Sequence, residues 1–147
     1  MKKLLVILIV LTTIFSGCRY KEGPMISFRS IKQRLDGHGW SISELTSDGI
    51  DSLKYFNDSC GGRFWFSFPF EEQSGIQLME GKKSINGAFS FNDNKKIMTV
   101  NLGSNWSNII APLSEGKKDW KILKLTNKIF KISTDVNGKH YVITFKL

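Results

Sequence analysis

The chain has 147 residues, and 21 basic against 13 acidic side chains give it a formal net charge of +8. This length fits one domain with a single core, and it is too short for two domains of ordinary size. The basic residues are scattered, except for pairs at 82–83, 95–96 and 117–118 that fall in or beside predicted turns. Such pairs are typical of solvated hairpin ends; the alternative is contact with anionic headgroups or polysaccharide.

The first 17 residues have the parts of a signal peptide. Lys2 and Lys3 form the positive start, and 4–15 is an apolar run that only two threonines interrupt. The run is shorter than the roughly 20 residues that cross a bilayer. The small residues Ser16 and Gly17 then lead directly to Cys18.

Phe15-Ser16-Gly17-Cys18 resembles the lipobox of bacterial lipoproteins, in which leucine is commoner than phenylalanine at the first position. The resemblance implies cleavage just before Cys18, a lipid on this cysteine and anchoring to a membrane of the bacterial cell envelope, with the outer membrane expected. The polar residues of 18–27 are expected to form a tether between the membrane and the domain. The alternatives are an ordinary cleaved signal peptide with an unmodified Cys18, or an uncleaved anchor. The residues after Cys18 lack a clear acidic run, so periplasmic and surface display both fit. No nucleic-acid partner is expected in that compartment.

A short helical turn is predicted at the start of the folded domain, which we place at 28–147. Ser30 is a favourable N-cap, and Ile31 and Leu35 share one face at four-residue spacing. Gly37 is a suitable residue to end the turn.

After Gly39 the apolar residues recur at every second position, which is the period of a half-buried strand. Gly87 allows a bend or a close backbone approach within its strand. Residues 51–56 fit either a short helix or an irregular cover, and 103–118 are predicted to form a long loop. The pattern predicts eight strands, at 40–46, 63–70, 75–80, 84–91, 95–102, 119–125, 129–134 and 139–147.

Short turns join most of these strands. Asp48-Gly49, Asn92-Asp93-Asn94, Asn127-Lys128 and Asn137-Gly138 are sequences typical of tight turns, and the last favours a type I′ turn. Consecutive strands joined in this way are antiparallel, and closure into a barrel removes the exposed edges. The predicted fold class is therefore all-β, an eight-stranded antiparallel up-and-down barrel with a short N-terminal helical turn.

Several segments, in their order and spacing, carry a family resemblance over most of 26–147. They are 26–35, Trp40, 48–51, 87–93, 120–125 and 141–145. Together they resemble the lipocalin-like domain of small Bacteroidetes lipoproteins. His38 stands two residues before Trp40, where lipocalins generally have a glycine, so the resemblance is to the looser lipocalin-like class. It implies a barrel fold and a cell-surface setting, without an activity.

Aromatic residues dominate the predicted interior. Phe64, Phe66, Phe68 and Phe70 lie on one face of the strand at 63–70. They either line a ligand pocket or fill the core, and packing is favoured because a core needs such residues in any case. The candidate ligand-binding set is Phe64, Phe66, Phe68, Phe89, Phe91 and Trp120.

Residues that usually carry chemistry are sparse. His38 and His140 stand far apart, and neither has a metal-ligand spacing such as His-Glu-x-x-His. Cys60 has no base nearby in the sequence that would form its thiolate, so we expect a passive thiol. We therefore predict no metal, no cofactor and no enzymatic activity; an enzyme is the least favoured class.

Two non-enzymatic functions remain. The leading hypothesis is a membrane-anchored, lipocalin-like lipoprotein that binds a small hydrophobic ligand or acts as an accessory surface component. The second is a protein-interaction subunit of a cell-surface complex without a ligand cavity. Its candidate anchor is Trp106 in the 103–118 loop, because an exposed tryptophan is a typical interface residue.

Overall fold

The computed structural model describes residues 29–70, 75–80, 83–102, 111–114 and 116–147. The signal peptide and tether expected at 1–27, with Cys18, lie outside the described residues, and so does Trp106. Within those ranges no helix is both long and apolar enough to cross a membrane. The elements are α2 (Ile31–Leu35), β1 (Gly39–Ser47), β2 (Ile50–Asp51), α3 (Leu53–Cys60), β3 (Trp65–Ser67), β4 (Gly75–Glu80), β5 (Lys83–Phe91), β6 (Ile97–Leu102), β7 (Gly116–Leu125), β8 (Ile129–Val136) and β9 (Lys139–Lys146).

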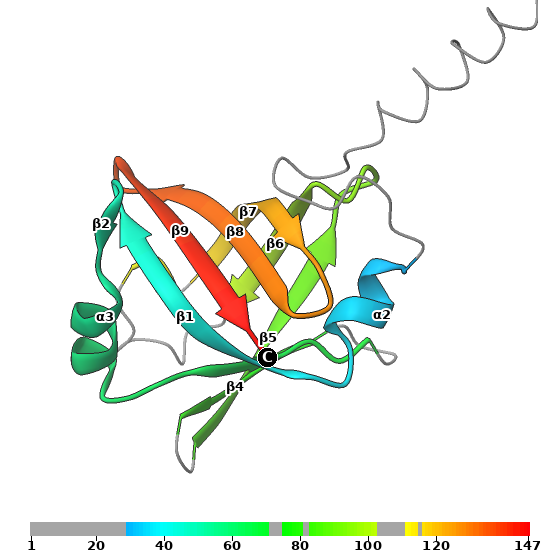
Figure 1. Cartoon of the computed structure of the whole chain (residues 1–147), viewed down its shortest axis with the longest axis horizontal. Helices are drawn as coiled ribbons and strands as arrows, with labels where there is room; N and C mark the ends of the chain where they lie inside the picture. Colours follow the sequence, from blue (N-terminus) through cyan, green and yellow to red (C-terminus); the bar gives the residue numbers. More distant parts are fainter. Residues whose placement is uncertain (1–28, 71–74, 81–82, 103–110, 115) are drawn as a thin grey trace, which may run out of the picture.

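The strands form one nine-stranded antiparallel sheet, which confirms the all-β class (Figure 1). The strand order is β2-β1-β3-β4-β5-β6-β7-β8-β9, and β1 makes a further pairing with β9. Along β1, Gly39–Ser41 pair with β3, whereas Ser41–Ser47 pair with β9. The eight expected strands are all present, although several bounds differ, and β2 is an additional two-residue strand that pairs with the end of β1.

Two tight turns follow the sequence prediction. Asn137 and Gly138 both have positive φ angles, 52° and 76°, as a type I′ turn requires between β8 and β9. Asp48 and Gly49 do the same between β1 and β2, with φ angles of 51° and 82°. Asparagine, aspartate and glycine tolerate this left-handed region best, so local chemistry sets both turns.

The strand predicted at 63–70 is shorter in the structure, because β3 covers only Trp65–Ser67. Pro69 has no backbone N–H to donate to a neighbouring strand. The N–H of Phe70 donates instead to the Asp36 carboxylate, at 3.3 Å, so this part of the chain is held by the α2–β1 connection. The aromatic alternation continues into the segment, and Phe68 is buried although it lies outside the strand.

Two other predicted bounds are wrong for identifiable reasons. β6 begins at Ile97 rather than at residue 95, because the side-chain oxygen of Asn92 accepts the N–H groups of Lys96 and Ile97, each at 3.0 Å. β7 begins at Gly116, inside the segment predicted as a loop, and its first residues pair with the end of β6. The basic pair at 117–118 therefore lies in a strand.

The ambiguous segment after β2 is helical. In α3, the Asp51 carboxylate accepts the N–H of Leu53 at 3.0 Å, and Gly61 ends the helix with a left-handed φ of 78°. Phe56 is the buried residue of this helix and packs against Phe64, with ring centroids 5.6 Å apart. The helix therefore covers one part of the core.

The predicted N-terminal turn is confirmed as α2. Ser30 and Gln33 form a capping box, in which each side chain accepts a backbone N–H of the other residue. The guanidinium Nη1 of Arg34 donates to the carbonyl oxygen of Leu125, which fixes α2 beside the end of β7 (Figure 1). Trp40 Nε1 donates to the carbonyl of Leu35 at 3.4 Å.

The core lies on the inner face of the sheet and is mostly aromatic and branched aliphatic. Trp40, Phe130 and Phe145 are at most 1% exposed, and Phe130 contacts both other rings. Gly87 makes the close backbone approach that its position predicted: a Cβ there would lie 2.9 Å from the carbonyl oxygen of Asn101. No side chain fits between β5 and β6 at this point.

Candidate functional site

The predicted ligand-binding residues lie together in the core. Phe91 is half-buried and stacks against Phe70, with ring centroids 6.2 Å apart. Phe68 contacts three other rings, those of Phe66, Phe89 and Phe130. At most 5% of each of the other five is exposed: Phe64, Phe66, Phe68, Phe89 and Trp120.

The space between these side chains is very small. The cavity has a volume of about 10 Å³, and its lining consists of Phe66, Phe68, Met98, Val100, Leu102, Leu113, Trp120, Ile132 and Phe145. A single buried water needs roughly 10–15 Å³ together with polar partners. The lining is apolar, and drug-sized ligands occupy pockets of roughly 300–1,000 Å³. In this conformation the aromatic cluster is a filled core.

A much larger hollow lies on the outer face of β6, β7, β8 and β9. We call it the outer-face groove; its volume is about 630 Å³, within the range of ligand pockets. The inward residues of these strands, such as Met98 and Ile132, are buried. The groove is lined by Asn94, Lys96, Ile97, Asp119, Lys121, Leu123, Ser133, Thr134, Asp135 and His140.

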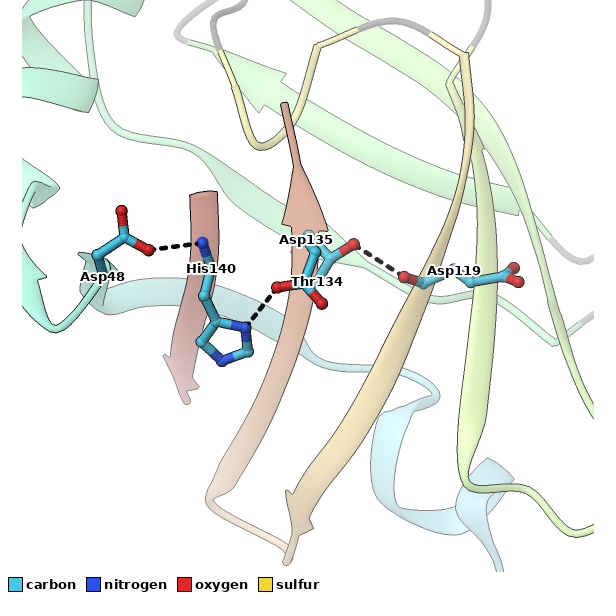
Figure 2. Close-up of polar contacts among 5 residues, drawn as sticks. All are labelled: Asp48, Asp119, Thr134, Asp135 and His140. Atoms are coloured by element: carbon cyan, nitrogen blue, oxygen red, sulfur yellow. Dashed lines mark hydrogen bonds and ion pairs between the residues drawn. The ribbon is translucent and has the colours of Figure 1, made fainter. Parts of the chain in front are cut away.

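Polar side chains of the groove contact one another across neighbouring strands (Figure 2). His140 Nδ1 lies 2.7 Å from Asp135 Oδ1, in the register where β9 faces β8. Asp119 Oδ1 accepts a hydrogen bond from the hydroxyl of Thr99 at 2.6 Å. The hydroxyl of Thr134 donates to the backbone oxygen of Asp119 at 2.9 Å. The first two contacts place the carboxylates of Asp135 and Asp119 on the outer face, each beside a residue of a neighbouring strand.

Asp48 fixes the strand that carries His140. Its carboxylate accepts the His140 N–H at 2.8 Å (Figure 2), and its backbone N–H donates to the His140 carbonyl, also at 2.8 Å. The pair extends the β1–β9 ladder by one step beyond Ser47 and Tyr141. Asp48, whose backbone has a positive φ of 51°, therefore connects the β1–β2 turn to the start of β9.

Cationic and apolar groups complete the groove. Lys121 is exposed and pairs in register with Ile97 of β6 and Ser133 of β8. The register between β7 and β8 shifts around Leu123, and this leucine lines the outer groove rather than the core. The groove thus offers ammonium, carboxylate and imidazole groups around two apolar side chains, an arrangement that suits hydrogen bonding to a polar molecular surface.

The residues that usually carry chemistry lie on different elements of the described structure. The imidazole of His140 contacts a carboxylate, whereas the nearby hydroxyl of Thr134 donates to a backbone oxygen. His38 is exposed in the α2–β1 connection and Cys60 is half-buried at the end of α3. Within the described ranges, no three His, Cys, Asp or Glu side chains gather closely enough to hold a metal ion.

Two further surface features lie outside the groove. Trp65 on β3 is 54% exposed, so this strand presents an accessible indole. A second hollow, of about 730 Å³, runs along α3 and the loop that follows it, between Asp51 and Arg63. In it, hydrogen bonding and charge from Asp58 raise the pKa of Lys54, whose ammonium lies 2.5 Å from that carboxylate.

Sequence reasoning missed most of the groove. It considered His140 but did not single out Asp119, Lys121 or Asp135. Their proximity depends on the register between β7, β8 and β9, which alternation alone does not fix. A related signal is the turn sequence Asp48-Gly49, because the Asp48 carboxylate accepts the N–H of His140.

Comparisons with protein-family models, with curated proteins and with solved structures found no match to this chain.

Proposed function

We propose that the chain is a lipid-anchored protein of the bacterial cell envelope that acts as an accessory binding module, with its binding site on the outer face of a lipocalin-like barrel. The interior serves only as the core. Of the two non-enzymatic functions that the sequence suggested, this is the interaction subunit without a ligand cavity. Its anchoring surface is the outer-face groove, in place of the loop containing Trp106.

The strand pairings support a barrel. Each consecutive pair from β3 to β9 is antiparallel, and β1 pairs with both the first and the last member of that series. We infer an eight-stranded barrel, with β2 as a short appendage at the end of β1. A barrel of this size has an interior just wide enough for packed side chains or one small ligand.

One observation carries the choice between the two functions. The cavity among Phe66, Phe68 and Trp120 has about 10 Å³, whereas the groove outside the same strands has about 630 Å³. A small apolar ligand would have to displace several packed rings, each of which is worth several kcal/mol of stability. Binding on the outer face needs no such rearrangement.

Attachment of lipid is tested directly because the chain has only two cysteines. Cells expressing the protein would be fed an alkyne-labelled fatty acid, and the label on the purified protein would be detected after click coupling. We expect label on the wild type and on Cys60→Ala, and none on Cys18→Ala. Label that persists in Cys18→Ala, or its absence from the wild type, would contradict lipidation at Cys18.

The binding surface is tested by site-specific photo-crosslinking in the native host. A photoreactive amino acid would replace Lys121 in the groove, Trp65 on β3, or the exposed Lys146 at the end of β9 as the matched control. We expect one discrete adduct from position 121 and none from position 146. A discrete adduct from position 65 alone would move the interface to β3, and equal adducts from all three positions would contradict a specific surface.

A further inference from the structure

One end of the domain gathers exposed basic side chains. Figure 1 shows α2, the β5–β6 turn and the β7–β8 turn at this end, opposite the β1–β2 and β8–β9 turns. Two contacts with β7 hold the elements together: Arg34 of α2 bonds the Leu125 carbonyl, and the Lys96 carbonyl accepts the Ile122 N–H at 2.8 Å. We call it the tether end; its exposed basic residues are Arg29, Lys32, Lys95, Lys96 and Lys128, of which Lys96 also lines the outer-face groove.

Acidic groups do not balance these charges among the residues described. At the tether end Asp93 is exposed, whereas Asp36 is half-buried and accepts the N–H of Phe70. The opposite end has mixed charges: Lys54 pairs with Asp58, and His140 pairs with Asp135. Basic side chains therefore outnumber acidic ones at the tether end.

The same end is the one nearest to the expected anchor. Arg29 is the first described residue, and the stretch 19–28 separates it from Cys18. A stretch of this length reaches at most about 40 Å even when it is fully extended. The tether end therefore lies, on average, closer to the anchoring membrane than the opposite end.

The attraction between basic side chains and an anionic membrane depends strongly on their distance from the membrane surface. The surface potential of an anionic bilayer falls off within a Debye length, about 8 Å at physiological salt. Only charges on the face nearest the membrane feel it, and each Lys or Arg there strengthens attachment about fivefold. Scattered lysines at the opposite end contribute nothing in this orientation.

We propose that the tether end is a membrane-contacting surface that rests on anionic phospholipid headgroups, so that the β1–β2 and β8–β9 turns point away from the bilayer. This inference rests on the proposed lipid anchoring. In this orientation His140 and Asp135 of the outer-face groove lie on the side that faces away from the membrane, accessible to a partner.

The test removes the lipid and measures the protein surface alone. The exported chain, residues 18–147 with Cys18→Ala, would be sedimented with phosphatidylcholine vesicles that contain or lack phosphatidylglycerol. One variant carries Lys32→Gln, Lys95→Asn and Lys128→Gln; asparagine suits the left-handed φ of 56° at residue 95. The matched control carries Lys54→Gln, Lys117→Gln and Lys139→Gln, with the same change in net charge. Circular dichroism spectra check that both variants are folded.

We expect the tether-end variant to lose affinity for the anionic vesicles by about a hundredfold, and the control by less than about threefold. Raising the salt concentration should weaken wild-type binding, and vesicles without phosphatidylglycerol should not bind it. Equal losses in the two variants, or no preference for anionic vesicles, would overturn the proposal. Binding to a soluble acidic polysaccharide in place of vesicles would also overturn it. The fatty-acid labelling experiment tests lipidation of Cys18 separately. A failure of the proposed anchoring is therefore distinguishable from a failure of the proposed membrane-contacting surface.

Discussion

The inner and outer faces of β6–β9 are built from alternating residues of the same strands, yet they differ in polarity, in burial and in the free volume beside them. The inner face holds Met98, Trp120 and Ile132 and leaves about 10 Å³ unfilled, whereas the outer face forms a groove of about 630 Å³. Successive side chains on a strand point to opposite faces. One strand can therefore supply stability on one side and recognition on the other, and substitutions on the two faces should have separable effects.

The largest effect is expected from the inner face. Phe68→Ala removes a ring that contacts three others and is 1% exposed, so the free energy of unfolding should fall by about 3–5 kcal/mol. Urea denaturation followed by tryptophan fluorescence measures the loss. Phe68→Leu, which keeps much of the volume, should cost less than half as much. A loss below about 1 kcal/mol for Phe68→Ala would show that the interior is loose.

A smaller loss is expected where the inner face has no room for a methyl group. A Cβ on Gly87 would lie 2.9 Å from the Asn101 carbonyl oxygen and 3.0 Å from the Leu102 side chain. Gly87→Ala should therefore destabilise the protein by about 1–3 kcal/mol. Gly39→Ala is the control, since a Cβ there would meet only the Trp65 ring, at 3.6 Å, which is an ordinary van der Waals contact. Equal stability of wild type and Gly87→Ala would refute the close approach.

Asp48 affects the outer-face groove indirectly, because it holds the start of β9, the strand that carries His140. Asp48→Ala removes the acceptor of the His140 N–H and places alanine at a φ of 51°, so we expect a loss of about 1–2 kcal/mol. Asp48→Asn keeps an acceptor oxygen and a residue that tolerates this φ, and should lose less than half as much. Hydrogen exchange of the His140 amide reports the same bond. If the alanine and asparagine variants were equally stable, the side-chain bond would be irrelevant.

The smallest effect on stability belongs to the groove itself. The side chains of His140 and Asp135 are 52% and 79% exposed, and such pairs contribute about 0–1 kcal/mol. Asp135→Asn should therefore leave the urea midpoint almost unchanged, while it abolishes the crosslinked adduct from position 121. A stability loss as large as that of Phe68→Ala would assign Asp135 to the core, and an unchanged adduct would remove it from the interface.

The sequence predicted the parts of the fold that depend on local chemistry. Asn137-Gly138 and Asp48-Gly49 form the expected turns because few other residues adopt positive φ without strain, and the capping residue Ser30 begins α2 as expected. The strand predicted at 63–70 is longer than β3, which ends at Ser67. The alternating phenylalanines continue beyond this point, although Pro69 has no N–H for strand pairing.

The residues that line the outer-face groove could not be predicted from local chemistry. Asp119 and Asp135 lie on different strands, and a change of one residue in strand register would move either of them to the other face. Leu123 lies on the outward face by simple alternation with Trp120 and Ile122, whereas the register shift between Ile122 and Lys124 brings Leu125 into the core. Such a shift has no sequence signal comparable to that of a tight turn.

Native mass spectrometry of the full-length protein purified from its own host, in a mild detergent, tests the central claim most directly. A core with about 10 Å³ of free space predicts a mass equal to the processed, lipid-modified polypeptide, with no small apolar molecule retained. A stoichiometric apolar ligand that is retained by the wild type and lost from Phe68→Ala would contradict the claim, because it would place binding inside the sheet and not on its outer face.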